Sequence, residues 1–165
     1  MLNQIEGLCA ICKSPVSVIS IGAELYESCS ECGGVPFTVK AYDGVLYVVS
    51  NPNQKGVKIG ITKKPIEARL KSLSSTGVPG KFIAHAVFPS NKLKSDEKRV
   101  HEKLTRKRIE KEHFELEPLE AVLKCYRILN RRTPVFFEQE MRTKFQLQLL
   151  IDKNKMELRL LGKNS

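Results

Sequence analysis

Four of the five cysteines fall into two C-x-x-C pairs, and this spacing limits the fold of the N-terminal part more than any other feature. The pairs are Cys9 with Cys12 and Cys29 with Cys32, with 16 residues between them. Each pair can present two thiolates to one metal ion, and the intervening residues can form a hairpin that brings the pairs together. The sequence therefore predicts a structural zinc ion on these four cysteines. A disulfide framework or a redox dithiol is the alternative.

Short stretches around the cysteine pairs have the composition of β-strands. They are expected at residues 15–21, 24–27 and 35–41. With the metal site, residues 1–42 resemble a zinc ribbon, which is a fold element and does not by itself indicate a function. The fifth cysteine, Cys125, stands in a helical stretch and is expected to be a small buried residue.

Basic residues are concentrated outside this module. Residues 1–42 hold two basic and four acidic side chains, residues 43–130 hold 18 and 10, and residues 131–165 hold eight and four, which gives the chain a net charge of +10. A basic body indicates a polyanionic partner, first nucleic acid and then acidic lipid or protein. A merely soluble basic surface is the alternative. The densest cluster, and the predicted nucleic-acid contact, comprises Lys103, Arg106, Lys107, Arg108 and Lys111.

The hydropathy pattern contains no candidate membrane span. No run of about 18 apolar residues is present, and the N-terminal residues lack the basic start and apolar stretch of a signal peptide. We therefore expect a soluble, cytoplasmic protein without a membrane partner.

The centre of the chain, residues 44–62, reads as a β-hairpin. Residues 45–49 and 57–61 are rich in β-branched and aromatic side chains, and a polar loop with Pro and Gly separates them. Tyr47 and Lys58 are polar groups within these apolar runs. Because burying a polar group alone costs on the order of a few kcal/mol, both are candidates for function.

The rest of the body predicts one more strand and three helices. We expect a helix at 66–75, a strand at 82–88, a helix capped by Ser95 whose first turn holds Asp96, and a helix at 119–130. Together with the hairpin, residues 43–130 are expected to form a three-stranded antiparallel sheet flanked by helices, so the fold class is α+β.

Residues 131–165 are expected to form a C-terminal helix and hairpin extension. Apolar residues alternate with mostly polar ones over 145–151 and again over 156–160, and residues 152–155 have the composition of a turn. This pattern predicts a second β-hairpin with one apolar face. The face would cover either the body or a second copy of the chain, so a homodimer through the hairpin is a prediction.

A set of body residues resembles the motifs of the GIY-YIG nuclease superfamily. In chain order they are Tyr47, Lys58 with Ile59 and Gly60, Arg69, His101 and Glu112. The chain is most similar to the small phage and bacterial branch whose second motif reads KIG and whose first helix ends in STGVP, as residues 75–79 do here. The resemblance covers about residues 44–120. It departs from the family pattern at Leu73, where several members place a histidine, and at His113, where an aromatic residue is usual.

The resemblance implies a metal-dependent DNA endonuclease that hydrolyses phosphodiester bonds. Tyr47 would act as the base or water-orienting group with help from the positive charge of Lys58, and Arg69 would clamp the phosphate. Glu112 would hold Mg²⁺ or Mn²⁺, and His101 would assist proton transfer or orient a partner.

The same resemblance implies double-stranded DNA as the partner, in a bacterial host cell and with the chain encoded by a phage, a satellite or the bacterium. One active site cuts one strand, so a monomer would be a nickase. Glu115 is a rival metal ligand, and Asn130 is a candidate for the asparagine that some members carry. The alternatives are an RNA-directed nuclease and a nucleic-acid-binding protein that keeps the fold without turnover.

Overall fold

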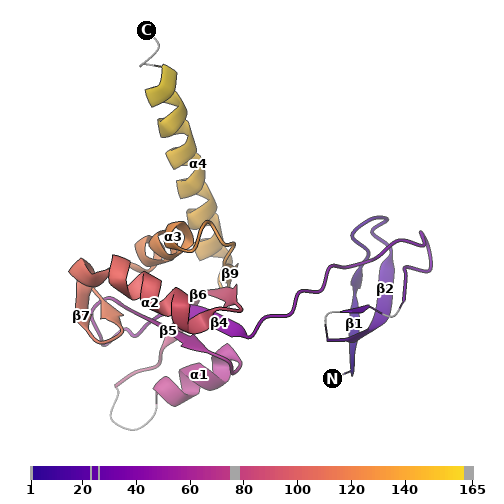
Figure 1. Cartoon of the computed structure of the whole chain (residues 1–165), viewed down its shortest axis with the longest axis horizontal. Coiled ribbons are helices and arrows are strands. Elements are labelled where there is room, and N and C mark those ends of the chain that lie inside the picture. Colours follow the sequence, from indigo (N-terminus) through magenta and orange to yellow (C-terminus); the bar gives the residue numbers. More distant parts are fainter. Residues whose placement is uncertain (1, 23, 26, 75–78, 162–165) are drawn as a thin grey trace. The chain divides into compact units, whose positions relative to one another are not determined.

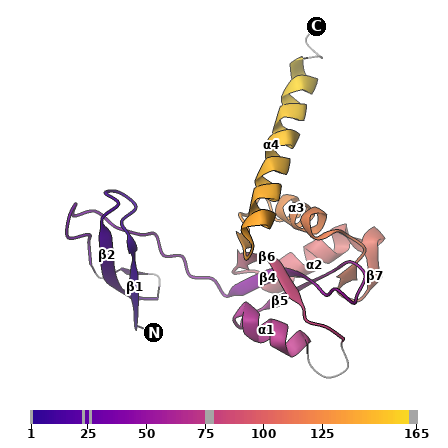
Figure 2. The same cartoon turned by 180° about the vertical axis from the view of Figure 1, so that it is seen from behind.

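Two compact units make up the chain, residues 1–42 and residues 43–165, and each is described by itself (Figures 1 and 2). The computed structural model describes residues 2–22, 24–25, 27–74 and 79–161. None of the helices in these ranges combines the length and the hydrophobicity that a bilayer span requires.

The first unit is a small antiparallel sheet in the order β1-β2-β3. Its strands are β1 (Leu2–Leu8), β2 (Pro15–Ile21) and β3 (Glu24–Leu25). The predicted return strand begins as expected at β3, although Tyr26 lies outside the described residues. The predicted closing strand at 35–41 is wrong, because these residues form no strand and the sheet consists of β1, β2 and β3. Pro36 instead accepts a hydrogen bond from the Ala10 N–H at 2.9 Å.

The second unit is built on a sheet in the order β7-β8-β5-β4-β6-β9, in which every pairing is antiparallel. Its strands are β4 (Gly44–Ser50), β5 (Val57–Thr62), β6 (Ile83–Ser90), β7 (Arg108–Glu110), β8 (His113–Phe114) and β9 (Val135–Phe136). The expected three-stranded sheet is the centre of this sheet, β5-β4-β6. The three outer strands are only two or three residues long, which is too short for an alternating pattern to reveal.

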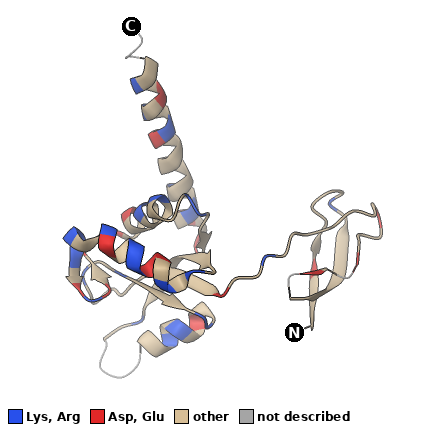
Figure 3. Ribbon diagram, viewed as in Figure 1, with Lys and Arg blue, Asp and Glu red and all other residues tan. Residues whose placement is uncertain are grey.

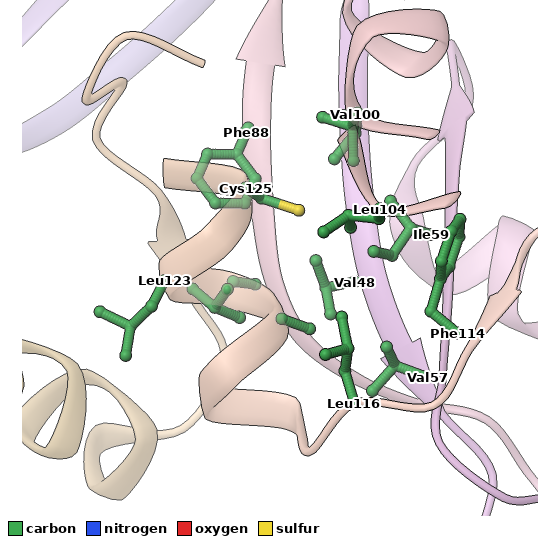
Figure 4. Close-up of a cluster of buried hydrophobic side chains, with 14 of the residues drawn as sticks. Val48, Val57, Ile59, Phe88, Val100, Leu104, Phe114, Leu116, Leu123 and Cys125 are labelled. Atoms are coloured by element: carbon green, nitrogen blue, oxygen red, sulfur yellow. The ribbon is translucent and has the colours of Figure 1, made fainter. Parts of the chain in front are cut away.

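Helices cover both faces of the sheet. α1 (Ile66–Leu73) packs on one face, where Tyr47, Val49 and Phe82 form a small core. α2 (Leu93–Lys103) and α3 (Pro118–Ile128) pack on the other face, and a 3₁₀ turn, η1 (Thr105–Lys107), follows α2. The residues labelled in Figure 4 form much of this larger core. Cys125 lies within it, and burial raises the pKa of its thiol to about 12, as suits an inert core residue.

The C-terminal extension is a helix, α4 (Gln139–Leu161), so the predicted β-hairpin is wrong. Phe145 anchors α4 in the core, and its ring centroid lies 5.3 Å from that of Tyr126 and 5.1 Å from that of Phe136. No Gly or Pro interrupts the helix, and its many Leu, Gln, Glu, Lys and Arg residues favour helix. The homodimer prediction loses its structural basis, because no second apolar strand face exists in the described residues of this segment.

Candidate active site

Tyr47 and Lys58 lie on the same face of the sheet. Lys58 pairs directly with Val49 on β4, and Tyr47 stands two residues before Val49 on the same strand. Since directly opposed residues and residues two apart share a face, both side chains point to the side that α1 covers. The Tyr47 phenol and the Lys58 ammonium can act on the same substrate only if they share a face in this way.

The phenol of Tyr47 is held by Arg69. The Tyr47 ring is fully buried, and its Oη accepts hydrogen bonds from Arg69 Nε at 3.2 Å and Arg69 Nη2 at 3.1 Å. The guanidinium carbon also lies 5.6 Å from the ring centroid, within cation–π range. Burial raises the pKa of Tyr47 above its ordinary value, and the Arg69 contact only partly offsets this rise. Within the described residues, the cation that contacts the phenol is therefore Arg69, whereas the Lys58 ammonium pairs with Glu112.

Gly60 allows the phenol to reach this position. Gly60 is the cross-strand partner of Tyr47, and a Cβ added to it would lie 2.5 Å from Tyr47 Oη and 2.8 Å from Cζ. The same Cβ would lie 3.3 Å from Glu112 Oε2. The phenol and the carboxylate therefore approach one another above a residue that has no side chain.

Glu112 is fixed at the outer edge of β5. Its carbonyl accepts a hydrogen bond from the Ile59 N–H at 3.0 Å, and its Oε2 forms an ion pair with Lys58 Nζ at 2.6 Å. The Lys58 side chain is 15% exposed and that of Glu112 is 35% exposed. The carboxylate is thus oriented by a well-covered ammonium group and still accessible from solvent.

His101 contacts the backbone of the same strand. Its Nε2 lies 2.9 Å from the Ile59 carbonyl, which can only accept, so Nε2 carries the proton. Its ring centroid lies 5.1 Å from that of Phe114. His101 therefore supports the β5 edge beside Glu112.

Glu97 is a site residue that sequence reasoning missed. It lies one helical turn before His101 on α2 and is half-buried, and its carboxylate has no direct hydrogen bond or ion pair within the described residues. Burial raises its pKa, and Glu112 raises it further, whereas His101, Lys58 and Arg69 oppose the rise. The spacing of four residues between Glu97 and His101 indicated that both lie on the same side of the helix. The sequence did not indicate that this side of the helix lies near Glu112.

The predicted nucleic-acid contact residues lie on consecutive segments that begin with the last residue of α2. All are exposed, and they occupy the end of α2, η1, β7 and the turn before Glu112; Figure 3 shows the charged residues along these segments. They are Lys103, Arg106, Lys107, Arg108 and Lys111. Arg108 also lies over the Phe114 ring, 5.7 Å from its centroid. The basic cluster therefore leads directly to the carboxylate of the site.

The two weaker candidates from the sequence have other partners. Glu115 forms an exposed ion pair with Lys55 at 2.5 Å, which holds the pKa of Glu115 below its ordinary value. Asn130 accepts a hydrogen bond from Arg99 Nη2 at 3.0 Å. The structure brings neither residue into the group formed by Tyr47, Arg69 and Glu112.

The four paired cysteines form a cluster in the first unit. The Sγ atoms of Cys9, Cys12, Cys29 and Cys32 all lie within 4.8 Å of one another, and none is in a disulfide. The Cys9–Cys32 and Cys12–Cys29 separations are 3.8 and 3.7 Å. Four thiolates about 2.3 Å from a tetrahedral zinc ion would be separated by about 3.8 Å, so the cluster is compatible with a structural zinc site.

The two cysteine turns share one backbone pattern. In the first, the Lys13 N–H bonds to the Cys9 carbonyl at 3.0 Å, and in the second the Gly33 N–H bonds to the Cys29 carbonyl at 2.8 Å. Lys13 and Gly33 both have left-handed φ values, 65° and 68°. The N–H of Cys12, with a smaller contribution from that of Ile11, also lowers the pKa of the Cys9 thiol. These turns present thiolates to a common centre.

Comparison with known proteins identifies one domain. Residues 44–130, just over half of the chain, match the model of the T5orf172 domain, a phage-associated, nuclease-like domain. Neither the curated proteins nor the solved structures gave a match. The matched segment contains Tyr47, Lys58, Arg69, Glu97 and Glu112. On this match, the chain belongs to the T5orf172 domain family.

Proposed function

We propose that the protein is a metal-dependent DNA endonuclease of the GIY-YIG type. The observation that carries the proposal is the convergence of Tyr47, Arg69, Lys58 and Glu112 around Gly60 on one face of the sheet. Phosphodiester hydrolysis needs an oriented water molecule, positive charge at the phosphate and a ligand for a divalent cation. These four side chains supply groups for each need, and membership of a nuclease-like family supports the same conclusion.

Tyr47 and Arg69 act together in this proposal. Because burial raises the pKa of Tyr47, its phenol remains protonated at neutral pH and orients the attacking water instead of acting as a strong base. Two nitrogens of Arg69 bind the phenol oxygen, and within the described residues Nη1 has no hydrogen-bond partner. This nitrogen can therefore donate to a phosphate oxygen while the guanidinium holds Tyr47 in place.

The donor set at Glu112 fits a hard divalent cation. Its carboxylate is accessible, Glu97 adds negative charge beside it, and carboxylate oxygens are the ligands that Mg²⁺ and Mn²⁺ prefer. Glu112 would hold the cation, which supplies charge stabilisation to the phosphate and the leaving oxygen. Lys58 orients the Glu112 carboxylate and adds positive charge to the face that the phosphate approaches.

The exposed basic cluster at the end of α2 and along η1 and β7 would bind the DNA backbone, with double-stranded DNA as the substrate. Phosphate contacts of this kind give salt-dependent binding without sequence specificity. One site cuts one strand, so the expected product of a monomer is nicked DNA. The cysteine cluster would hold a structural zinc ion in the first unit.

The test is cleavage of supercoiled plasmid in the presence of Mg²⁺. We expect the wild type to convert it to the nicked form and Glu112→Gln to reduce the rate by at least about a hundredfold, as for loss of a group that stabilises transition-state charge. Glu115→Gln is the matched control, because Glu115 is an exposed acid three residues away and paired with Lys55.

Two results would contradict the proposal. Plasmid that stays supercoiled with the wild type, while DNA is still retarded in a gel, would indicate a binding protein without turnover. Loss of activity in Glu115→Gln but not in Glu112→Gln would move the metal ligand from Glu112 to Glu115. A parallel assay with RNA of the same sequence would reveal an RNA-directed enzyme.

A further inference from the structure

A pocket of about 220 Å³ lies outside the group of residues described above. Its walls come from the loop between β4 and β5 and from the β7–β8 hairpin. It is lined by Gln54, Lys55, Ile109, Glu110 and His113. None of these residues has a role in the proposed hydrolysis.

The pocket adjoins the proposed site. His113 is the direct cross-strand partner of Lys58, so its side chain lies on the same face of the sheet as Lys58 and Tyr47. His113 also follows Glu112 in the chain, and Lys58 lies between β4 and the pocket-lining strand β8. A strand whose phosphate lies at Glu112 and Lys58 would therefore have a neighbouring nucleotide at the pocket.

The hydrogen-bonding groups of the pocket are partly fixed. His113 Nε2 lies 3.1 Å from Gln54 Oε1, and since an amide oxygen can only accept, Nε2 is the donor. This contact orients the Gln54 amide and leaves its NH₂ group as a donor. The Glu110 carboxylate has no hydrogen bond or ion pair within the described part of the chain, so it is an acceptor for a ligand. The Lys55 ammonium is bound to Glu115 at 2.5 Å.

The pocket also offers flat and apolar surface. The Ile109 side chain is 50% exposed, although it belongs to a strand, and the His113 imidazole is half-buried beside it. An aromatic ring stacks on such surfaces, and base stacking is the common way in which proteins bind unpaired nucleotides.

We propose that this pocket binds an unpaired nucleobase next to the cleaved phosphate, and that it prefers guanine. Guanine carries adjacent N1–H and N2–H₂ donors for the Glu110 carboxylate and acceptors at O6 and N7 for the Gln54 amide. Adenine, cytosine and thymine lack this pair of adjacent donors. In a duplex these donors are occupied by base pairing, so the base must leave the helix or belong to a single-stranded segment. The position beside the cut rests on the proposed nuclease function, whereas the base preference can be tested without it.

The experiment measures binding to protein that carries Glu112→Gln, so that cleavage does not interfere. The probes are fluorescent thymidine nonamers whose central nucleotide is guanine, adenine, cytosine or an abasic site, and the readout is anisotropy at constant salt. We expect guanine to bind roughly tenfold more tightly than the abasic site, as expected for one stacked base. Adding Glu110→Gln should reduce the ratio of guanine to adenine affinity to near one.

The ratio of guanine to adenine affinity is the informative quantity, because removal of an acidic charge strengthens binding to every oligonucleotide alike. Glu120→Gln is the matched control, since Glu120 is an exposed acid on α3 that pairs with Lys124, and it should leave the ratio unchanged. Equal affinity for all four probes, or a guanine preference that survives Glu110→Gln, would overturn the proposal.

Mapping of cut ends separates this proposal from the nuclease function. With the wild type, guanine should be enriched at one fixed position beside the cut, and Glu110→Gln should abolish the enrichment. Cleavage without enrichment refutes the pocket and leaves the nuclease standing. Guanine-selective binding without any cleavage refutes the nuclease and supports the base pocket alone.

Discussion

Gly60→Ala is a sharp test of the site, because it changes a residue that has no chemistry of its own. The new Cβ would lie 2.5 Å from Tyr47 Oη and 2.8 Å from its Cζ. Carbon atoms in favourable contact are about 3.5–4.0 Å apart, so the phenol must move by about 1 Å. Tyr47 is fully buried, and the movement would cost about 1–3 kcal/mol of stability, as for other overpacked positions.

The effect on activity should exceed the effect on stability. A misplacement of about 1 Å in a catalytic group reduces the rate on the order of a hundredfold. Initial rates of plasmid nicking, measured at a temperature where both proteins are folded, give this loss directly. Gly7→Ala is the matched control, because its Cβ would meet the Phe37 ring at 3.4 Å, an ordinary contact, and its φ is not left-handed.

A double-mutant cycle tests whether the loss acts through the phenol. Tyr47→Phe removes the hydroxyl that Arg69 binds and keeps the ring. If Gly60→Ala acts by displacing that hydroxyl, the double variant should be little slower than Tyr47→Phe alone. Near wild-type activity in Gly60→Ala, or fully additive losses in the cycle, would refute the placement of Tyr47 over Gly60 as the basis of the site.

Three further predictions concern other parts of the molecule. Wild-type protein should contain about one zinc ion per chain by elemental analysis and Cys9→Ser clearly less, whereas equal contents would remove the zinc site. Burial lowers the pKa of His85 below its ordinary value of 6.5, so the unfolded chain takes up a proton at a higher pH than the folded protein does. The free energy of unfolding should therefore fall as pH drops below about 6.5. In denaturant titrations, the free energy of unfolding of His85→Gln should depend less steeply on pH. Asp96→Ala should lower the free energy of unfolding by about 3 kcal/mol in the same titrations. The reason is that buried Asp96 pairs with Arg132 and accepts a hydrogen bond from the Ser90 hydroxyl at 2.6 Å. A loss under about 1 kcal/mol would contradict this prediction.

The central strands and the first three helices could be predicted because their apolar residues follow a clear period. The face shared by Tyr47 and Lys58 also follows from strand pairing. The partner of Lys58 could not be predicted, because Glu112 stands in a turn between two strands of three and two residues, where no period exists. Glu97 could not be predicted either, because its electrostatic interaction with Glu112 depends on how α2 packs against β5.

The C-terminal helix shows why an alternating pattern can mislead. Phe145, Leu147 and Leu149 alternate as in a strand, but Leu150 continues the apolar run, and in the helix these side chains are spread around the axis. Only Phe145 is buried in this helix, and Leu147 and Leu150 are more than half exposed. The apolar residues therefore alternate with a period of two in a helix that does not bury one continuous face. The absence of Gly and Pro over 23 residues was the better signal.

The three consecutive residues Lys58, Ile59 and Gly60 connect the site to the core. The Ile59 side chain is fully buried in the larger core, while its N–H binds Glu112 and its carbonyl accepts from His101. Its neighbours on either side point to the opposite face, where Lys58 binds the Glu112 carboxylate and Gly60 makes room for the phenol. A shift of β5 by one residue would place Ile59 on the site face and Lys58 in the core, so it would lose the packing and the site together. The burial of Ile59 therefore fixes the register that assembles the site, and the stability of the larger core and the geometry of the chemistry depend on the same strand pairing.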